Sequence, residues 1–282
     1  MIGTSVEDMT QREHRYENLI ARLRREAKVR DEEAAALTER LEAAEHELKD
    51  LRVIRDALTP PELPQRPGLE LAAAFLPAAE QVSGDFYLVA EGPQESTLLV
   101  VGDVIGHGLE AARRASFVRT TFAATAPFSD DPRQLLSWAN TALVERAGTG
   151  SEFVTAACVT FLPSERLLRW AYAGHPPALS IYDRRELVAP SQGTPLGIEE
   201  DSAYVEGSLR SEGSAGVLLY TDGLTEATHD GKLFGLEGVR AVLGALHNPS
   251  PREAIASLRI RAAEFAYGGL TDDLCMLAVR IV

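Results

Sequence analysis

Apolar positions along the chain follow two different spacings, and the first covers residues 10–58. This stretch contains no Gly and no Pro, and its apolar residues step by three and then four. They fall at Ile20, Leu23, Ala27, Ala34, Leu37, Leu41, Ala44, Leu48, Leu51 and Leu58, and Arg30 and Arg55 occupy the two remaining steps. An a/d repeat sustained over this length is typical of a coiled coil. The pattern therefore predicts a long N-terminal coiled-coil helix.

The partner of this helix is predicted from the width of its apolar stripe and from its charges. A helix packed on its own domain is the alternative, but such a helix usually carries a wider apolar face than an a/d stripe. A parallel dimer would place opposite charges together at Arg40 with Glu45 and Glu47 with Arg52, and like charges at Glu26 with Asp31. Two attractive pairs against one repulsive pair favour a parallel homodimer through residues 20–58.

Prolines mark the end of the helix and divide the chain. The stretch after Leu58 contains Pro60, Pro61, Pro64 and Pro67, and prolines at this density stop a helix. The sequence thus predicts a dimerisation and regulatory helix at 1–58, a proline-rich linker at 59–67 and a single domain at 68–282.

The second spacing, within 69–282, alternates as strands do or repeats as helices do. Strands are expected at Leu69–Leu76, Phe86–Ala90, Thr97–Val101, Val154–Leu162, Leu167–Tyr172, Ala178–Tyr182, Gly216–Tyr220 and Leu274–Val282. Helices are expected at Leu109–Ala126, Pro132–Ala147, Leu236–Ala245 and Pro251–Ala266, with Asp131 and Ser250 as N-caps of two of them. Because the strands come in runs, the pattern indicates an α+β fold with antiparallel sheets and helices laid over them.

Composition narrows the classes of function. The 282 residues include 28 Lys and Arg against 42 Asp and Glu, which gives a net charge of −14. A chain this acidic is a poor candidate for binding nucleic acid or anionic lipid by charge alone. Cys158 and Cys275 lie far apart, which predicts neither a disulfide framework nor a zinc site and favours a cytoplasmic protein. We expect no membrane span, because no apolar run approaches 18 residues.

Aspartates recur at the ends of the expected strands. Asp85 precedes one strand, Asp103 and Asp222 follow two others, and Asp272 and Asp273 open the last one. Each alone is explained by turn chemistry. If the strand ends meet at one edge, however, several carboxylates converge, and like charges at short distance need compensation. Since Lys and Arg are absent from the immediate strand ends, a divalent cation is the expected counter-charge, and oxygen-only ligands suit Mg²⁺ or Mn²⁺.

Two histidines lie in Gly-containing turns, and their roles stay open at this stage. His107 lies just before an expected helix and close to Asp103, and His175 lies between two strands. Either side chain is read as a general acid or hydrogen-bond anchor, or as a structural turn residue.

Six segments in order resemble the protein phosphatase 2C superfamily, in its bacterial SpoIIE/RsbU-like branch. They are Val82–Phe86, Val101–Gly108, Ala173–Ala178, Gly193–Gly197, Tyr220–Ala227 and Thr271–Leu274. The resemblance covers 68–282 and implies an αββα sandwich, in which two antiparallel sheets are flanked by helices. It also implies a metal-dependent protein-serine/threonine phosphatase, in which a water bridging two Mn²⁺ or Mg²⁺ ions attacks the phosphate.

The resemblance also implies roles for individual residues. Asp103 would bridge both ions and Val104 would offer its backbone carbonyl, where many relatives have Gly. Asp222 and Asp272 would bind the other ion, and Asp85 would be an additional acidic residue near the first. The role of Asp273 is left open. The expected catalytic residues are Asp103, Asp222 and Asp272.

The substrate and the rival functions follow from the same resemblance. The family's usual substrates are phosphorylated anti-sigma-factor antagonists in partner-switching pathways, and helices leading into the phosphatase are expected to regulate it. A dimeric scaffold that binds a signalling partner without turnover is the alternative. A hydrolase of nucleotides or small phosphoesters would need a basic pocket, which the sequence does not indicate.

Overall fold

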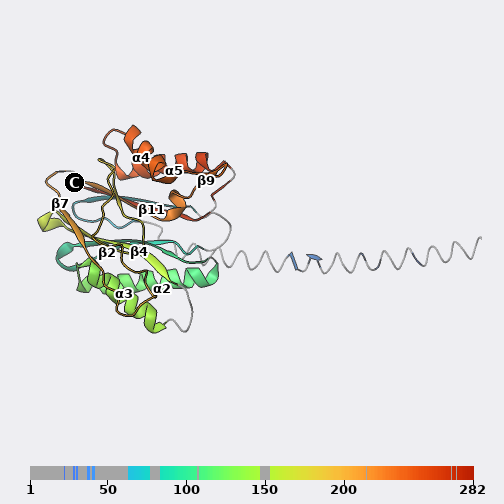
Figure 1. Ribbon diagram of the computed structural model, residues 1–282, viewed down its shortest axis with the longest axis horizontal. Helices are drawn as coiled ribbons and strands as arrows, with labels where there is room; N and C mark the ends of the chain where they lie inside the picture. Colours follow the sequence, from blue (N-terminus) through green and yellow to red (C-terminus); the bar gives the residue numbers. More distant parts are fainter. Residues whose placement is uncertain are drawn as a thin grey trace, which may run out of the picture. The chain divides into compact units, whose positions relative to one another are not determined.

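Two antiparallel sheets lie face to face between two pairs of helices (Figure 1). The computed structural model describes residues 63–76, 83–106, 108–146, 153–213, 215–267, 269–270 and 272–282, and seven helical residues between 22 and 41. The chain divides into the units Met1–Asp50 and Leu51–Val282. The coiled-coil seam over 20–58 and the beginning of the proline-rich linker lie mostly outside the described residues.

The larger sheet has five strands. In sheet order they are β2 (Phe86–Glu91), β3 (Thr97–Val104), β4 (Val154–Leu162), β5 (Leu167–Ala173) and β7 (Gly207–Arg210). Its outer face is covered by α2 (Leu109–Thr125) and α3 (Pro132–Arg146). β7 is a strand that the sequence analysis did not predict.

The second sheet has four strands. In order they are β1 (Leu69–Leu76), β11 (Leu274–Ile281), β8 (Gly216–Tyr220) and the short β6 (Leu179–Ser180). The helices α4 (Gly235–Ala245) and α5 (Pro251–Phe265) cover its outer face. The remaining elements are a hairpin of β9 (Thr228–His229) and β10 (Lys232–Leu233), and the short 3-10 turns η1 (Pro93–Glu95), η2 (Ala126–Phe128), η3 (Pro163–Glu165) and η4 (Asp222–Leu224).

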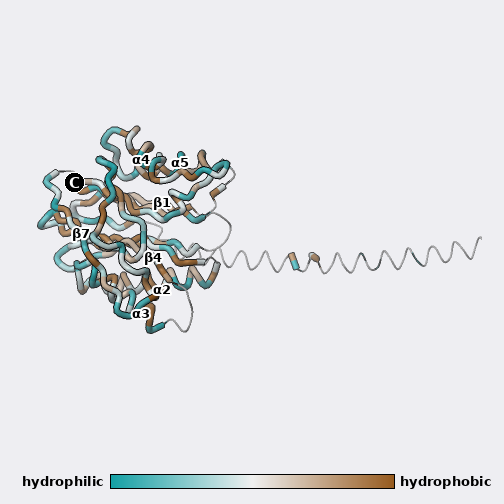
Figure 2. Tube along the Cα trace, viewed as in Figure 1, coloured by the Kyte–Doolittle hydropathy of each residue, from teal (hydrophilic) through white to brown (hydrophobic). Residues whose placement is uncertain are grey.

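Side-chain alternation explains why the strands are apolar on both faces. In β4, Ala156 and Cys158 face the layer of α2 and α3, while Ala157 and Val159 face the other sheet. Successive side chains of a strand point to opposite faces, so a strand covered on both sides needs apolar residues at every position. Hydrophobic residues accordingly recur through both sheets, and hydrophilic ones gather in the outer loops (Figure 2). The predicted α+β class with two antiparallel sheets between helices is confirmed.

The N-caps of two helices are also confirmed. The Ser250 hydroxyl accepts from the Glu253 amide, and the Glu253 carboxylate accepts from the Ser250 amide, which forms a capping box. At α3, the Asp131 carboxylate accepts from the Arg133 amide at 2.9 Å.

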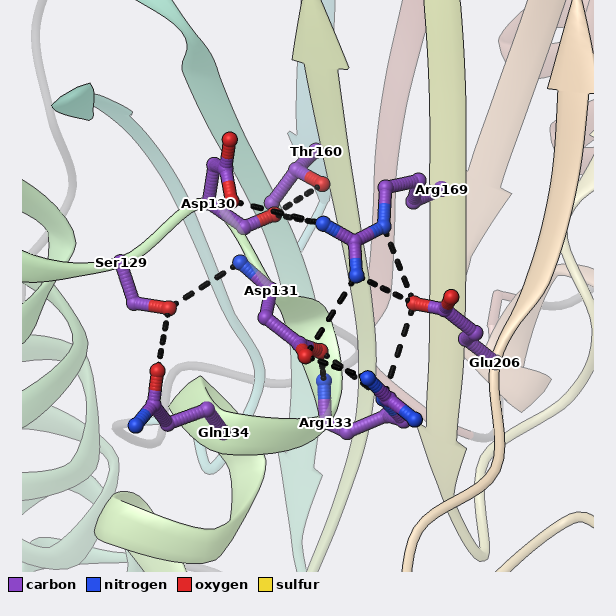
Figure 3. A network of polar contacts seen from close by, with 8 residues as sticks. All are labelled: Ser129, Asp130, Asp131, Arg133, Gln134, Thr160, Arg169 and Glu206. Atoms are coloured by element: carbon purple, nitrogen blue, oxygen red, sulfur yellow. Dashed lines mark hydrogen bonds and ion pairs between the residues drawn. The ribbon is translucent and has the colours of Figure 1, made fainter.

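An ion-pair network holds the beginning of α3 against strands β4 and β5 of the larger sheet (Figure 3). The Arg169 guanidinium of β5 lies 2.7 Å from Glu206 and 3.4 Å from both Asp130 and Asp131. The buried Thr160 hydroxyl of β4 donates to the Asp130 carbonyl at 2.8 Å. The network lies in the same sheet as Asp103, on β4, β5 and the residue before β7.

Two further findings concern the sequence predictions. Cys158 and Cys275 are both free thiols and both buried. Among the described residues, every helix is too short or too polar to cross a lipid bilayer.

Candidate metal centre

The predicted aspartates come from neighbouring strands of both sheets. Asp85 precedes β2, and Asp103 lies in β3, whose pairing with β4 extends the strand to Val104, beyond its predicted end. In the four-stranded sheet, Asp222 follows β8 and begins η4, while Asp272 lies two residues before β11. Because β2 pairs with β3 and β8 with β11, each sheet contributes two adjacent carboxylates.

Asp85 and Asp103 form the more buried pair. Burial raises the pKa of Asp85 well above its ordinary value, and the nearby charge of Asp103 raises it further. Burial and then the charge of Asp222 raise the pKa of Asp103 to about 6. A hydrogen bond between the two carboxyls raises the pKa of Asp85 and lowers that of Asp103, as expected when Asp85 carries the shared proton.

Asp222 belongs to a second acidic pair with Asp272. Burial and then the charge of Asp272 raise the pKa of Asp222. Glu226, which lies four residues later, also has a raised pKa, because of burial and then the charges of Asp222 and Asp272. The charges that act on Asp103 include Asp222, Asp272 and Asp273, so the two pairs form one acidic cluster.

The donor chemistry of this cluster fits a hard divalent cation. The charged groups with the largest effects on these carboxyls are other carboxyls, and oxygen donors are what Mg²⁺ and Mn²⁺ prefer. As the side chains lie, no three acidic, His or Cys side chains of the described residues have the spacing of a metal centre. Carboxylates without a counter-ion repel one another, so a bound cation would be needed to draw them together.

Two glycines bring backbone close to the predicted ligands. A Cβ on Gly84 would lie 2.7 Å from the Val104 carbonyl oxygen, and a Cβ on Gly223 would lie 1.9 Å from the Asp273 carbonyl oxygen. Val104 itself lies in the extended strand β3, so the Gly of many relatives is not required here for a positive φ. The role of Asp273, left open by the sequence, includes this backbone contact and a charge acting on Asp85 and Asp103.

The structure adds residues to which the sequence analysis gave no role. The fully buried Thr221 hydroxyl donates to the Asp85 carboxylate at 2.7 Å and accepts from the Cys275 amide at 3.0 Å. Thr221 and Glu226 both lie in the Tyr220–Ala227 segment. Their closeness to Asp222 in the sequence is the signal that could have indicated a role at the site. His107 lies outside the described residues. His175 is buried, and both of its ring nitrogens lie within hydrogen-bond distance of protein atoms, as expected of a hydrogen-bond anchor.

The raised pKa of Asp103 predicts how the metal-free chain responds to pH. The Asp103 carboxyl has its ordinary pKa of 3.8 in the unfolded chain and a pKa of about 6 in the folded chain, so the folded chain binds its proton more tightly. Stability is therefore lost as pH rises from about 4 to about 6, and the chain in chelator should be about 1 kcal/mol more stable at pH 5 than at pH 7 through this group. Urea unfolding at both pH values measures it. Asp103→Asn is the control, and equal pH dependence in wild type and variant would contradict the prediction.

Comparison with known proteins identifies the family of the chain. Residues 93–282 match the family described as Stage II sporulation protein E (SpoIIE). The phosphoserine phosphatase RsbU of Bacillus subtilis (strain 168) is 24% identical over 229 residues, which cover 80% of this chain and 68% of RsbU.

Two solved structures are similar in fold. The SiaA-PP2C domain of Pseudomonas aeruginosa superposes with a TM-score of 0.73 at 20% identity, over 86% of this chain and 98% of that one. The RsbU and RsbW domains of Rv1364c from Mycobacterium tuberculosis give a TM-score of 0.64 at 26% identity, over 77% of this chain and 60% of that one. The predicted family and its class of enzyme, a phosphatase, are confirmed.

Proposed function

Because the chain belongs to the SpoIIE family, we propose that it is a metal-dependent protein-serine/threonine phosphatase that hydrolyses phosphate esters on a phosphorylated protein. The observation that carries the proposal is the acidic cluster itself. Carboxyls from both sheets raise one another's pKa, which is a free-energy cost to the fold that only a bound cation or proton relieves.

The proposed ligands of two Mn²⁺ or Mg²⁺ ions are Asp85, Asp103, the Val104 carbonyl, Asp222 and Asp272. Such ions, when bound, supply charge for the phosphoryl oxygens and lower the pKa of water. The chain's own part is to place the oxygens. The Thr221 hydroxyl orients the Asp85 carboxylate, and the close approach at Gly84 fixes the Val104 carbonyl. Asp103, Asp222 and Asp272 are the proposed catalytic residues.

The proposed substrate is a phosphorylated anti-sigma-factor antagonist, and the proposed setting is a partner-switching pathway in the cytoplasm. The similarity to RsbU, a phosphoserine phosphatase, supports this substrate class. The dominance of acidic neighbours around the site argues against nucleotides and small phosphoesters, which are usually held by Lys and Arg. A large substrate can instead be held by contacts outside the site.

Incubation with a panel of phosphorylated antagonist proteins tests the proposal. We expect release of inorganic phosphate with Mn²⁺ or Mg²⁺ and none after chelation. Tight binding of a phosphoprotein without phosphate release in either metal would contradict the proposal and favour the non-catalytic scaffold.

We further propose that residues 20–58 form a parallel homodimeric coiled coil that regulates the phosphatase. Leu37 and Leu41 are d and a residues of the seam and lie in helical conformation with exposed fractions of 69% and 60%. Apolar side chains spaced in this way become buried when a second helix packs against them.

Sedimentation of the full chain tests the dimer. Leu37→Glu with Leu41→Glu should convert a dimer into a monomer, because it places charges in the seam, whereas Glu39→Gln, on the outer f position, should leave the mass unchanged. A chain beginning at Gly68 should also be monomeric. A double variant as dimeric as wild type would contradict the coil as the interface.

A further inference from the structure

His175 is held inside the protein by one residue from each sheet. Its side chain is 2% exposed. Ring atom Nδ1 lies 2.8 Å from the Thr155 hydroxyl of β4, and Nε2 lies 3.0 Å from the Tyr220 carbonyl oxygen at the end of β8. One imidazole therefore joins the five-stranded sheet to the four-stranded sheet.

The two partners define the protonation of the ring. A backbone carbonyl only accepts hydrogen bonds, so Nε2 must carry a proton and donate it to Tyr220. Burial lowers the pKa of His175 to about 4, so the ring is neutral near pH 7 and Nδ1 accepts from the Thr155 hydroxyl. Since both nitrogens have protein partners and the ring is buried, His175 is not placed to give a proton to a substrate.

The partners lie next to two of the proposed ligands. Thr155 is directly opposite Asp103 in the β3–β4 register, and Tyr220 is two residues before Asp222. Thr221, which lies between Tyr220 and Asp222, donates a hydrogen bond from its hydroxyl to the Asp85 carboxylate. The bridge through His175 thus connects the strand pair that carries Asp103 to the strand end from which Asp222 projects.

We propose that His175 is a positioning residue, which sets the separation between Asp103 and Asp222 by bridging Thr155 and Tyr220 in its Nε2–H tautomer. The proposal rests on the proposed function insofar as these carboxylates hold metal. Residues that orient metal ligands typically change metal affinity by 10–100-fold when removed. The bridge itself exists in the metal-free protein, so its two consequences are measured separately.

Metal affinity is the first measurement, by calorimetric titration of the full chain with Mn²⁺. We expect His175→Phe, which keeps the ring volume without its nitrogens, to weaken binding about tenfold or more. Thr155→Val should weaken it less, and adding it to His175→Phe should cost nothing further because the two act through one bond. His175→Gln, which retains an acceptor and a donor, should recover part of the loss.

Thr160→Val is the matched control. Thr160 is a buried threonine of the same strand as Thr155, and its hydroxyl donates one hydrogen bond to the Asp130 carbonyl (Figure 3). This substitution likewise removes one threonine hydrogen bond from β4, but on the side of the ion-pair network. We expect Mn²⁺ affinity within twofold of wild type. An equal loss in Thr160→Val and Thr155→Val would overturn the positioning role.

The metal-free chain supplies the second measurement. Imidazole ¹⁵N shifts should report the Nε2–H tautomer, and His175→Phe should speed amide hydrogen exchange at residues 221–223 at least tenfold, while Thr160→Val does not. Unchanged exchange and Mn²⁺ affinity in a folded His175→Phe chain would overturn the inference. If the wild-type chain binds no Mn²⁺ while His175→Phe still speeds exchange at residues 221–223, the proposed metal function is overturned and the bridge stands.

Discussion

Asp103→Asn is expected to reduce phosphate release from a phosphoserine protein on the order of a thousandfold or more. Asp103 is the carboxyl that links the two acidic pairs. It shares a hydrogen bond with Asp85, and the charges of Asp222 and Asp272 both act on it. Asparagine has nearly the same shape but removes the negative charge, so the substitution tests charge rather than packing.

The same variant should be no less stable than wild type in chelator. Burial and neighbouring carboxylates raise the pKa of Asp103 to about 6, so its ionised form destabilises the metal-free fold at neutral pH. A neutral amide removes that repulsion. Loss of activity without loss of stability would show that the Asp103 carboxylate serves the reaction and not the fold.

Steady-state phosphate release in Mn²⁺ and urea unfolding in chelator measure the two effects. Asp201→Asn is the matched control, because Asp201 is an exposed aspartate outside the cluster, and it should behave as wild type in both assays. Full activity in Asp103→Asn would remove this residue from the site.

The sequence predicted best where a strand or helix is specified by its own pattern. The β4 segment is apolar at nearly every position and was predicted with its observed bounds, Val154–Leu162. The helices were predicted to within one residue at each end, because N-caps such as Ser250 can be recognised from the neighbouring sequence.

Elements specified by their neighbours were missed or misjudged. β7 (Gly207–Arg210) is mostly exposed and polar, and it is a strand because it pairs with β5. The predicted strand Ala178–Tyr182 is only Leu179–Ser180, because the chain turns back there. The Ser180 amide donates to the Arg185 carbonyl, and the Ser180 carbonyl accepts from the Arg184 amide. The β9–β10 hairpin does have a local signal in the sequence, the Asp230-Gly231 turn, in which both residues have a positive φ.

The site shows the same division. Aspartates at strand ends predicted a cluster, because strand ends of one sandwich can meet at one edge. The roles of Thr221 and His175 depend on contacts between sheets, from Thr221 to Asp85 and from His175 to Tyr220. Such contacts join residues 45 or more positions apart, so the spacing of neighbouring residues in the sequence does not predict them.

Gly223→Ala is expected to disrupt the proposed metal site strongly, although it replaces none of the proposed ligands. The added Cβ would lie 1.9 Å from the Asp273 carbonyl oxygen and 2.8 Å from its carbonyl carbon. Both obstacles are backbone atoms, so a rotamer change does not relieve the clash. One of the two segments, η4 or the residues before β11, must move.

Neither segment moves freely. Just behind the contact, the Thr221 amide donates to the Cys275 carbonyl at 3.0 Å, and the Cys275 amide donates to the Thr221 hydroxyl at 3.0 Å. On the other side, the Asp222 carbonyl accepts from the amides of Thr225 and Glu226 at 2.8 and 2.7 Å. A shift therefore breaks buried hydrogen bonds, at roughly 1–3 kcal/mol for each group left unsatisfied.

The displacement also falls between Asp222 and Asp272, which are proposed to bind the same ion. A misplacement of about 1 Å in a catalytic constellation can cost on the order of a hundredfold in rate, and we expect at least that loss in phosphate release together with weaker Mn²⁺ binding. Gly213→Ala is the control, because a Cβ there meets no atom of the described residues within 4 Å. If Gly223→Ala kept wild-type Mn²⁺ affinity while Gly213→Ala did the same, the two loops could separate without consequence, and the site would not depend on the distance between Asp222 and Asp272.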